Sequence, residues 1–285
     1  MSPRFAERIV CLTEETTETL YLLGEERRIV GISGFTVRPP RARKEKPRVS
    51  AFTSAKIDKI LALEPDLVLG FSDLQADIAA ELVRKGIEVH VFNQRTVAEI
   101  LRVIRTLGGM IGCAGKADAL AEQLERNLER IRLEAQKLAA RPRVYFEEWD
   151  EPPIAAIRWV AEIIEIAGGE NCFPELALEA LGRNRIIADP LEVPRRRPDI
   201  ILGSWCGKKF NGAAVRARAG WQAVPAVVAG ELHEIKSSII LQPGPAALTD
   251  GIEAIHRIIR AWNEKGDGSI FRGAGASPTK HLAEK

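Results

Sequence analysis

The chain has 285 residues, of which 46% are hydrophobic and 28% charged, and its formal net charge is +2. This length and apolar content suffice for one large domain or two ordinary ones, whereas the near-neutral charge argues against a nucleic-acid binder or a membrane-surface protein. No apolar run approaches the ~18 residues that a membrane span needs. The four cysteines are far apart and lack zinc-site spacing, so buried thiols are expected rather than a metal site.

Strand and helix patterns alternate in the first 110 residues. Continuous apolar runs such as Leu67-Val68-Leu69 are typical of parallel strands that are covered on both faces. Residues 35–48 form a basic, proline-broken stretch that is expected to be a loop. In chain order we predict strands at 8–12, 28–32, 66–71 and 87–92, and helices at 13–23 (capped by Thr13), around 57–61, at 74–85 and at 97–107, the last one ended by Gly108-Gly109.

A long helix is predicted over residues 116–138. Its apolar residues recur every three or four positions, which places one stripe along a rod of roughly 35 Å. Arg141-Pro142 then stops the helix, because proline lacks the amide donor. A rod of this length between two strand-and-helix halves predicts a spine that joins two lobes.

The pattern restarts after this helix. Glu64-Pro65-Asp66-Leu67-Val68-Leu69 in the first half matches Arg197-Pro198-Asp199-Ile200-Ile201-Leu202 in the second, which favours two lobes that are built alike. The strands expected here are 143–146, 199–202 and 234–236, and the helices are 159–167, 191–195, 215–219 and 245–262. We therefore predict an N-terminal α/β lobe (1–115), a connecting helix (116–141), a C-terminal α/β lobe (142–262) and a mobile tail (263–285).

At this point the chain resembles the class of periplasmic binding proteins with a helical backbone, class III, which serve ABC importers of vitamin B12, ferric siderophores and haem. Within that class the likeness is greatest to the cobalamin-binding proteins. The stretches that carry it are Gly34-Phe35-Thr36-Val37-Arg38-Pro39-Pro40 with Val49-Ser50-Ala51-Phe52, residues 57–71 with their Glu64-Pro65-Asp66-Leu67-Val68, and Gly168-Gly169-Glu170-Asn171-Cys172-Phe173.

The resemblance implies two Rossmann-like lobes joined by a single long backbone helix, with the ligand cleft between them. It also implies a monomeric solute-binding protein that is not an enzyme, has no cofactor of its own, and presents a corrinoid or another metal chelate to an ABC permease. Two alternatives stay open on the same fold: a ferric-siderophore or haem binder, and a cytoplasmic binder or sensor of a small metabolite.

Location and docking are separate expectations. The family is periplasmic, yet residues 1–8 are short and mixed and do not read as a signal peptide, which keeps a cytoplasmic location open. Members of the family dock through an acidic residue on each lobe. Asp77 would serve in the first lobe, whereas the second lobe has Lys208-Lys209-Phe210 at the corresponding stretch.

A broad, flat ligand needs aromatic walls and a few polar groups. Because ligands gather at the carboxyl ends of parallel strands, loop and strand-end aromatics are the first candidates, and the alternative for each is plain core packing. Arginines would grip a phosphate or carboxylate edge with paired donors, and the alternative is a solvated basic loop. The candidate ligand-binding residues are Phe35, Arg38, Phe52, Phe71, Trp149, Arg158, Trp205 and Gln242.

Signatures of catalysis or metal binding are not found. The sequence has no GxSxG, no GxxxxGK[ST], no HExxH and no GxGxxG. Glu147 and Glu148 are adjacent on an extended segment and point opposite ways, which a paired-carboxylate mechanism cannot use. The sequence therefore favours a binding protein without a metal site.

Overall fold

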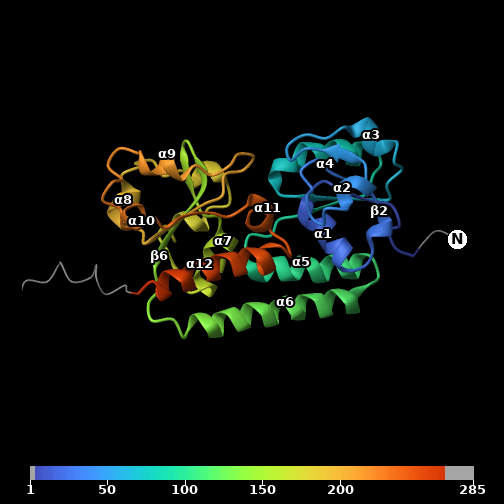
Figure 1. Ribbon diagram of the computed structural model, residues 1–285. Helices are drawn as coiled ribbons and strands as arrows, with labels where there is room; N and C mark the ends of the chain where they lie inside the picture. Colours follow the sequence, from blue (N-terminus) through green and yellow to red (C-terminus); the bar gives the residue numbers. More distant parts are fainter. Residues whose placement is uncertain (1–3, 267–285) are drawn as a thin grey trace, which may run out of the picture.

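The computed structural model describes residues 4–266, which form two α/β lobes above a layer of long helices (Figure 1). The first lobe contains a parallel five-stranded sheet of order β3-β2-β1-β4-β5. Its strands are β1 (Ile9–Cys11), β2 (Ile29–Ser33), β3 (Arg48–Ser50), β4 (Leu67–Phe71) and β5 (Val89–Phe92), and its helices are α1 (Glu14–Leu22), α2 (Ala42–Glu45), α3 (Ile57–Leu61) and α4 (Ala76–Arg84).

Both faces of this sheet are covered, as the continuous apolar strands predict. Ile9 and Leu69 belong to one hydrophobic cluster, whereas Val10 and Val68, which point to the opposite face, belong to another. Parallel strands that are buried on both faces leave their carboxyl ends as the place where polar side chains can gather.

The second lobe has its own sheet, of order β10-β9-β6-β7, with β8 pairing β6 outside this path. Its strands are parallel except for the hairpin of β6 with β7. They are β6 (Arg143–Asp150), β7 (Pro153–Ala155), β8 (Glu170–Asn171), β9 (Ile200–Gly203) and β10 (Leu232–Glu234), with helices α7 (Arg158–Ile166), α8 (Glu192–Arg196), α9 (Gly212–Arg216), α10 (Pro225–Ala229) and α11 (Ser237–Ile240).

Three helices connect the lobes. The predicted long helix is confirmed as α6 (Ala114–Ala135), which runs beneath both lobes with α5 (Val97–Met110) and α12 (Ile252–Glu264) beside it (Figure 1). The buried stripe of α6 includes Ala117, Leu124 and Ile131, and it lies in one hydrophobic core that extends from the first sheet to the second. The lobes are therefore joined through packed helices, which resist bending more than a loop would.

One predicted helix end is wrong. The helix α5 continues through Gly108 and Gly109 to Met110. A Cβ at Gly108 would lie 2.2 Å from the Cβ of Ala117, so this glycine lets α5 and α6 approach closely instead of ending the helix.

Three other expectations need correction. The strand β6 continues to Asp150, so residues 148–150 belong to a hairpin, not to a loop. The Thr13 hydroxyl donates to Glu15 Oε1 at 2.6 Å and makes no capping bond. The helix α12 includes residues 263–264, and the predicted tail beyond 266 lies outside the described residues.

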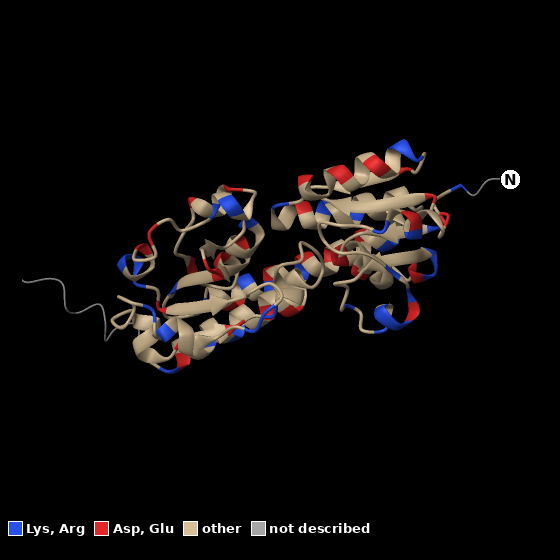
Figure 2. Ribbon diagram, turned by 90° about the horizontal axis from the view of Figure 1, so that it is seen from above, with Lys and Arg blue, Asp and Glu red and all other residues tan. Residues whose placement is uncertain are grey.

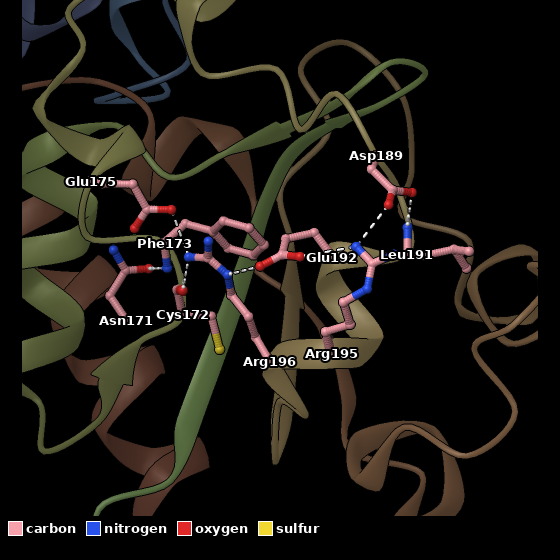
Figure 3. Close-up of polar contacts among 9 residues, drawn as sticks. All are labelled: Asn171, Cys172, Phe173, Glu175, Asp189, Leu191, Glu192, Arg195 and Arg196. Atoms are coloured by element: carbon pink, nitrogen blue, oxygen red, sulfur yellow. Dashed lines mark hydrogen bonds and ion pairs between the residues drawn. The ribbon is translucent and has the colours of Figure 1, made fainter.

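The turn after Gly169 is held by Arg196 of α8 (Figure 3). The Arg196 guanidinium stacks 4.0 Å above the Phe173 ring and donates to Cys172 O at 2.7 Å, while its remaining contacts are carboxylates. Figure 3 also shows Arg195, which is paired with the carboxylates of Asp189 and Glu192. These two cations therefore stabilise the second lobe and are not free for a ligand.

Acidic and basic segments are interspersed over both lobes, which agrees with the near-neutral net charge (Figure 2). Within residues 4–266, none of the helices is both long enough and apolar enough to cross a bilayer.

Candidate functional site

The two lobes meet where the first turn of α1 contacts the segment 242–246. Gln242 donates to Glu14 Oε1 at 3.1 Å, and the Ala246 amide donates to Glu18 Oε2 at the same distance. Arg38 lies beside them, 2.8 Å from Glu18 and 2.8 Å from Asp250. We call this contact the junction; it forms the floor between the lobes.

A buried carboxyl lies at the centre of the junction. Glu15 is 2% exposed. It packs closely against the segment 242–246, because a Cβ at Gly244 would lie 2.5 Å from the Glu15 Cβ. Burial raises the pKa of the Glu15 carboxyl to about 8, against the opposing effect of the Thr13 hydroxyl bond, and burial also raises the pKa of Glu14. A pKa of about 8 keeps the Glu15 carboxyl largely protonated near neutral pH, so this buried group is mostly uncharged in the junction.

A second contact joins the lobes behind the junction. Gln94 donates to Pro243 O at 3.0 Å, and Glu162 of α7 accepts from the Val97 amide at the start of α5 at 2.8 Å. The same carboxylate accepts from Arg158 Nε at 3.2 Å. Glu162 thus satisfies a free amide at the helix terminus of the other lobe and orients Arg158 at the same time.

A cavity of about 280 Å³ opens between the lobes beside these contacts. One guanidinium from each lobe lines it, Arg95 from the end of β5 and Arg158 from the start of α7. Arg95 lies 4.7 Å above the Phe71 ring, and its Nε has no hydrogen-bond partner among the described residues. Desolvation lowers the pKa of Arg95, and the nearby Arg185 acts in the same direction. The other end of this guanidinium makes only a long ion pair, with Nη2 3.9 Å from Asp73 Oδ1.

The first-lobe aromatics divide into two groups. Phe71 is 5% exposed and lies 6.5 Å from Phe52, with both backbones held by Gln75, which accepts from Phe71 N at 2.9 Å and donates to Phe52 O at 2.8 Å. Phe35 stands apart and is 56% exposed. The structure therefore brings Phe52, Phe71 and Arg95 together as one wall.

The second-lobe tryptophans lie at different depths. Trp149 is half-buried in β6 under Lys208, whose Nζ lies 4.6 Å from its ring centre. Trp205 is 5% exposed, donates to Glu147 Oε1 at 3.0 Å and packs on Phe210 at 5.0 Å. The buried carboxylate of Glu147 draws the indole into the core of the second lobe. Of these two tryptophans, Trp149 is therefore the more exposed.

The remaining predicted residues are divided among the junction, the cavity and the surface of α4. Arg38 and Gln242 belong to the junction, where carboxylates occupy their donors, and Arg158 lines the cavity. Asp77 is exposed in the first turn of α4. Within residues 4–266 no group of three or more histidine, cysteine or acidic side chains has the geometry of a metal site.

Sequence reasoning missed Arg95, Glu14 and the pair Arg185–Glu148, in which Arg185 donates to both Glu148 oxygens at 2.6 and 3.0 Å. Arg95 had a usable signal, because it lies in the short segment that follows β5, at the carboxyl end of a parallel strand. Glu14 had no such signal. Acidic residues are common in the first turn of exposed helices, where they interact favourably with the helix dipole.

The chain matches a known protein family and curated relatives over most of its length. The family model described as periplasmic binding protein matches residues 9–239. The vitamin B12-binding protein of Vibrio cholerae serotype O1 is 26% identical over 262 residues, covering 88% of each chain.

Solved structures show the same fold. The periplasmic vitamin B12-binding protein of Vibrio cholerae superposes with a TM-score of 0.73 at 22% identity, covering 91% of this chain and 98% of that one. The apo form of a periplasmic heme-binding protein from Roseiflexus sp. RS-1 gives 0.75 at 23% identity, covering 89% and 99%. The two-lobed fold and the family match over most of its length agree: this chain belongs to the periplasmic binding proteins.

Proposed function

We propose that this protein binds a flat metal chelate between its lobes, with a corrinoid as the first candidate. The observation that supports the proposal is the cluster of Phe52, Phe71 and Arg95, in which Arg95 stacks on Phe71, has no hydrogen-bond partner at Nε among the described residues and lines a cavity between the lobes. An aromatic surface suits the macrocycle, and a desolvated guanidinium suits an anionic edge. Trp149 and Lys208 would form the opposite wall.

The lobes would have to separate for such a ligand. A cavity of about 280 Å³ lies below the usual range of ligand pockets and cannot enclose a corrin ring. The junction and the packed helices would remain as the hinge, while the mouth between Arg95 and Trp149 widens.

Two observations favour a corrinoid over haem. Haem iron requires an axial ligand from the protein, whereas a corrinoid can bring its own nitrogen base. Of the described residues, no histidine or tyrosine lines the cavity at Arg95. The exposed Cys206 thiol lies near Glu14 and Glu148, and desolvation together with those carboxylates raises its pKa, which disfavours the thiolate that iron prefers.

The vitamin B12-binding name of the curated relative supports the same choice. The family further supports a role in import, with this chain delivering its ligand to an ABC permease outside the cytoplasm. Asp77 is the first-lobe candidate for docking, since it is exposed and makes no ion pair within residues 4–266. An uptake assay tests this: Asp77→Lys should reduce uptake and leave ligand affinity unchanged, whereas Glu81→Lys on the same helix is the control.

Ligand identity is tested by titrating purified protein with cyanocobalamin, haemin and a ferric siderophore while tryptophan fluorescence is recorded. We expect saturable quenching by the corrinoid at micromolar concentration, because Trp149 lies at the proposed wall. Trp149→Phe should remove most of the quenching and keep most of the affinity. Tight binding of haemin alone would replace the corrinoid by haem, and binding of none of the three would refute the proposal.

A further inference from the structure

We propose a second binding site, on the outer edge of the first lobe, for a small free oligophosphate. A groove of about 630 Å³ opens between α2, the edge strand β3 and α3. None of its lining residues lines the cavities between the lobes. The groove contains the cations Arg43, Lys46, Arg48, Lys56 and Lys59.

All the charged residues that line this groove are positive. No aspartate or glutamate is among its lining residues, and within residues 4–266 none of its five cations takes part in an ion pair. By contrast Arg41, on the other side of α2, pairs with Glu26 at 2.7 Å and lies 4.8 Å above the Tyr21 ring. Five cations around one hollow repel one another, and a multiply charged anion would relieve that repulsion.

The groove also has further hydrogen-bond donors. Lys59 Nζ donates to Arg48 O at 2.8 Å, which holds one ammonium group beside the edge strand. Ser50 and Ser54 line the same groove, and the Ser50 hydroxyl donates to Leu12 O at 3.4 Å. Guanidinium, ammonium and hydroxyl groups together are the donors that phosphate oxygens accept.

The concave shape of the groove favours a small ligand over a membrane surface. A concave groove surrounds a short chain of phosphate groups, whereas a flat membrane would contact only its rim. Because several phosphates spread over the groove would contact several cations at once, an oligophosphate should bind more tightly than a single phosphate.

Calorimetric titration of the full chain with inorganic tripolyphosphate tests the site. We expect one ion per chain, binding that weakens as salt increases, and at least tenfold weaker binding of Lys46→Gln/Lys56→Gln/Lys59→Gln. The matched control is Lys85→Gln/Lys137→Gln/Lys209→Gln, which removes the same charge from exposed lysines elsewhere and should bind as the wild type does.

Three results would overturn the proposal: no heat at millimolar tripolyphosphate, equal weakening in both triple variants, or binding to phosphatidylglycerol vesicles without binding to tripolyphosphate. The cyanocobalamin titration of the groove variant separates the two sites. Unchanged affinity for the corrinoid is the expected result, and a parallel loss of both affinities would contradict a separate groove site.

Discussion

Gly244 lies against Glu15 across the junction with no room for a side chain, since its Cβ would come within 2.5 Å of the Glu15 Cβ. Gly244→Ala should lower the free energy of unfolding by about 1–3 kcal/mol, because the segment or the helix α1 must shift. Denaturant unfolding measures this. Gly115→Ala is the control, because Gly115 lies exposed in α6 with open space around it and alanine there should stabilise by about 0.5–1 kcal/mol. Equal effects of the two changes would contradict the close contact.

The Glu15 carboxyl makes stability depend on pH. Its folded-state pKa is raised by burial to about 8 from 4.5, so the folded chain holds a proton that the unfolded chain loses between these values. The stability linked to this proton is complete below about pH 4.5 and is lost as the pH rises to about 8.

Glu15→Gln should therefore gain stability over the wild type as the pH rises, reaching about 2 kcal/mol near pH 8. Thermal unfolding followed at pH 5 and pH 8 measures the gain, and Glu81→Gln on the exposed face of α4 controls for the lost charge. A constant difference between Glu15→Gln and the wild type at both pH values would show that the carboxyl is solvated.

Two neighbouring glycines in α5 should respond in opposite ways. Gly108→Ala would press its methyl group into Ala117 of α6 and should cost about 1–3 kcal/mol. Gly109→Ala meets no neighbouring atom within 4 Å and should stabilise the helix by about 0.5–1 kcal/mol. Circular-dichroism melts of the two variants measure the contrast, and a stabilised Gly108→Ala would disprove the close crossing.

The carboxylate of Glu147 is fully buried and depends on Arg218, which donates to its two oxygens at 2.6 and 2.9 Å. Tyr145 OH and Trp205 Nε1 complete its hydrogen bonds. Arg218→Met should destabilise the protein by about 3–5 kcal/mol, because it leaves a buried charge without a partner.

The double change Arg218→Met/Glu147→Gln should recover part of that loss in chemical denaturation. Arg132→Ala, which breaks the exposed pair with Glu129, should cost less than about 1 kcal/mol. Similar losses for Arg218→Met and Arg132→Ala would mean that Glu147 is reached by water.

The fold was predictable where one pattern of apolar residues dominated a segment of the sequence. The stripe on α6 and the continuous apolar strands β4 and β9 predict their structures, because burial alone decides them. The predicted strand 143–146 ended before the hairpin part of β6, since the pairing with β7 is not visible in the local pattern.

The site was less predictable because its geometry comes from partners distant in sequence. Trp205 follows a strand, as a cleft residue should, but the buried Glu147, 58 residues earlier, draws its indole into the core. Glu14 and Gln242 are 228 residues apart, and only their contact shows that the acids of α1 belong to the junction. Phe71 stays a candidate because of its place at a strand end, and a rule that includes the residues just after a strand would also select Arg95.

The central claim is that the space between the lobes, at Arg95, is where the ligand binds. Calorimetric titration of cyanocobalamin into the wild type, Arg95→Gln and the exposed-site control Lys85→Gln tests it most directly. We predict one corrinoid per chain, at least tenfold weaker binding in Arg95→Gln, and unchanged binding in Lys85→Gln. Equal affinity in all three proteins would place the ligand elsewhere and contradict the account.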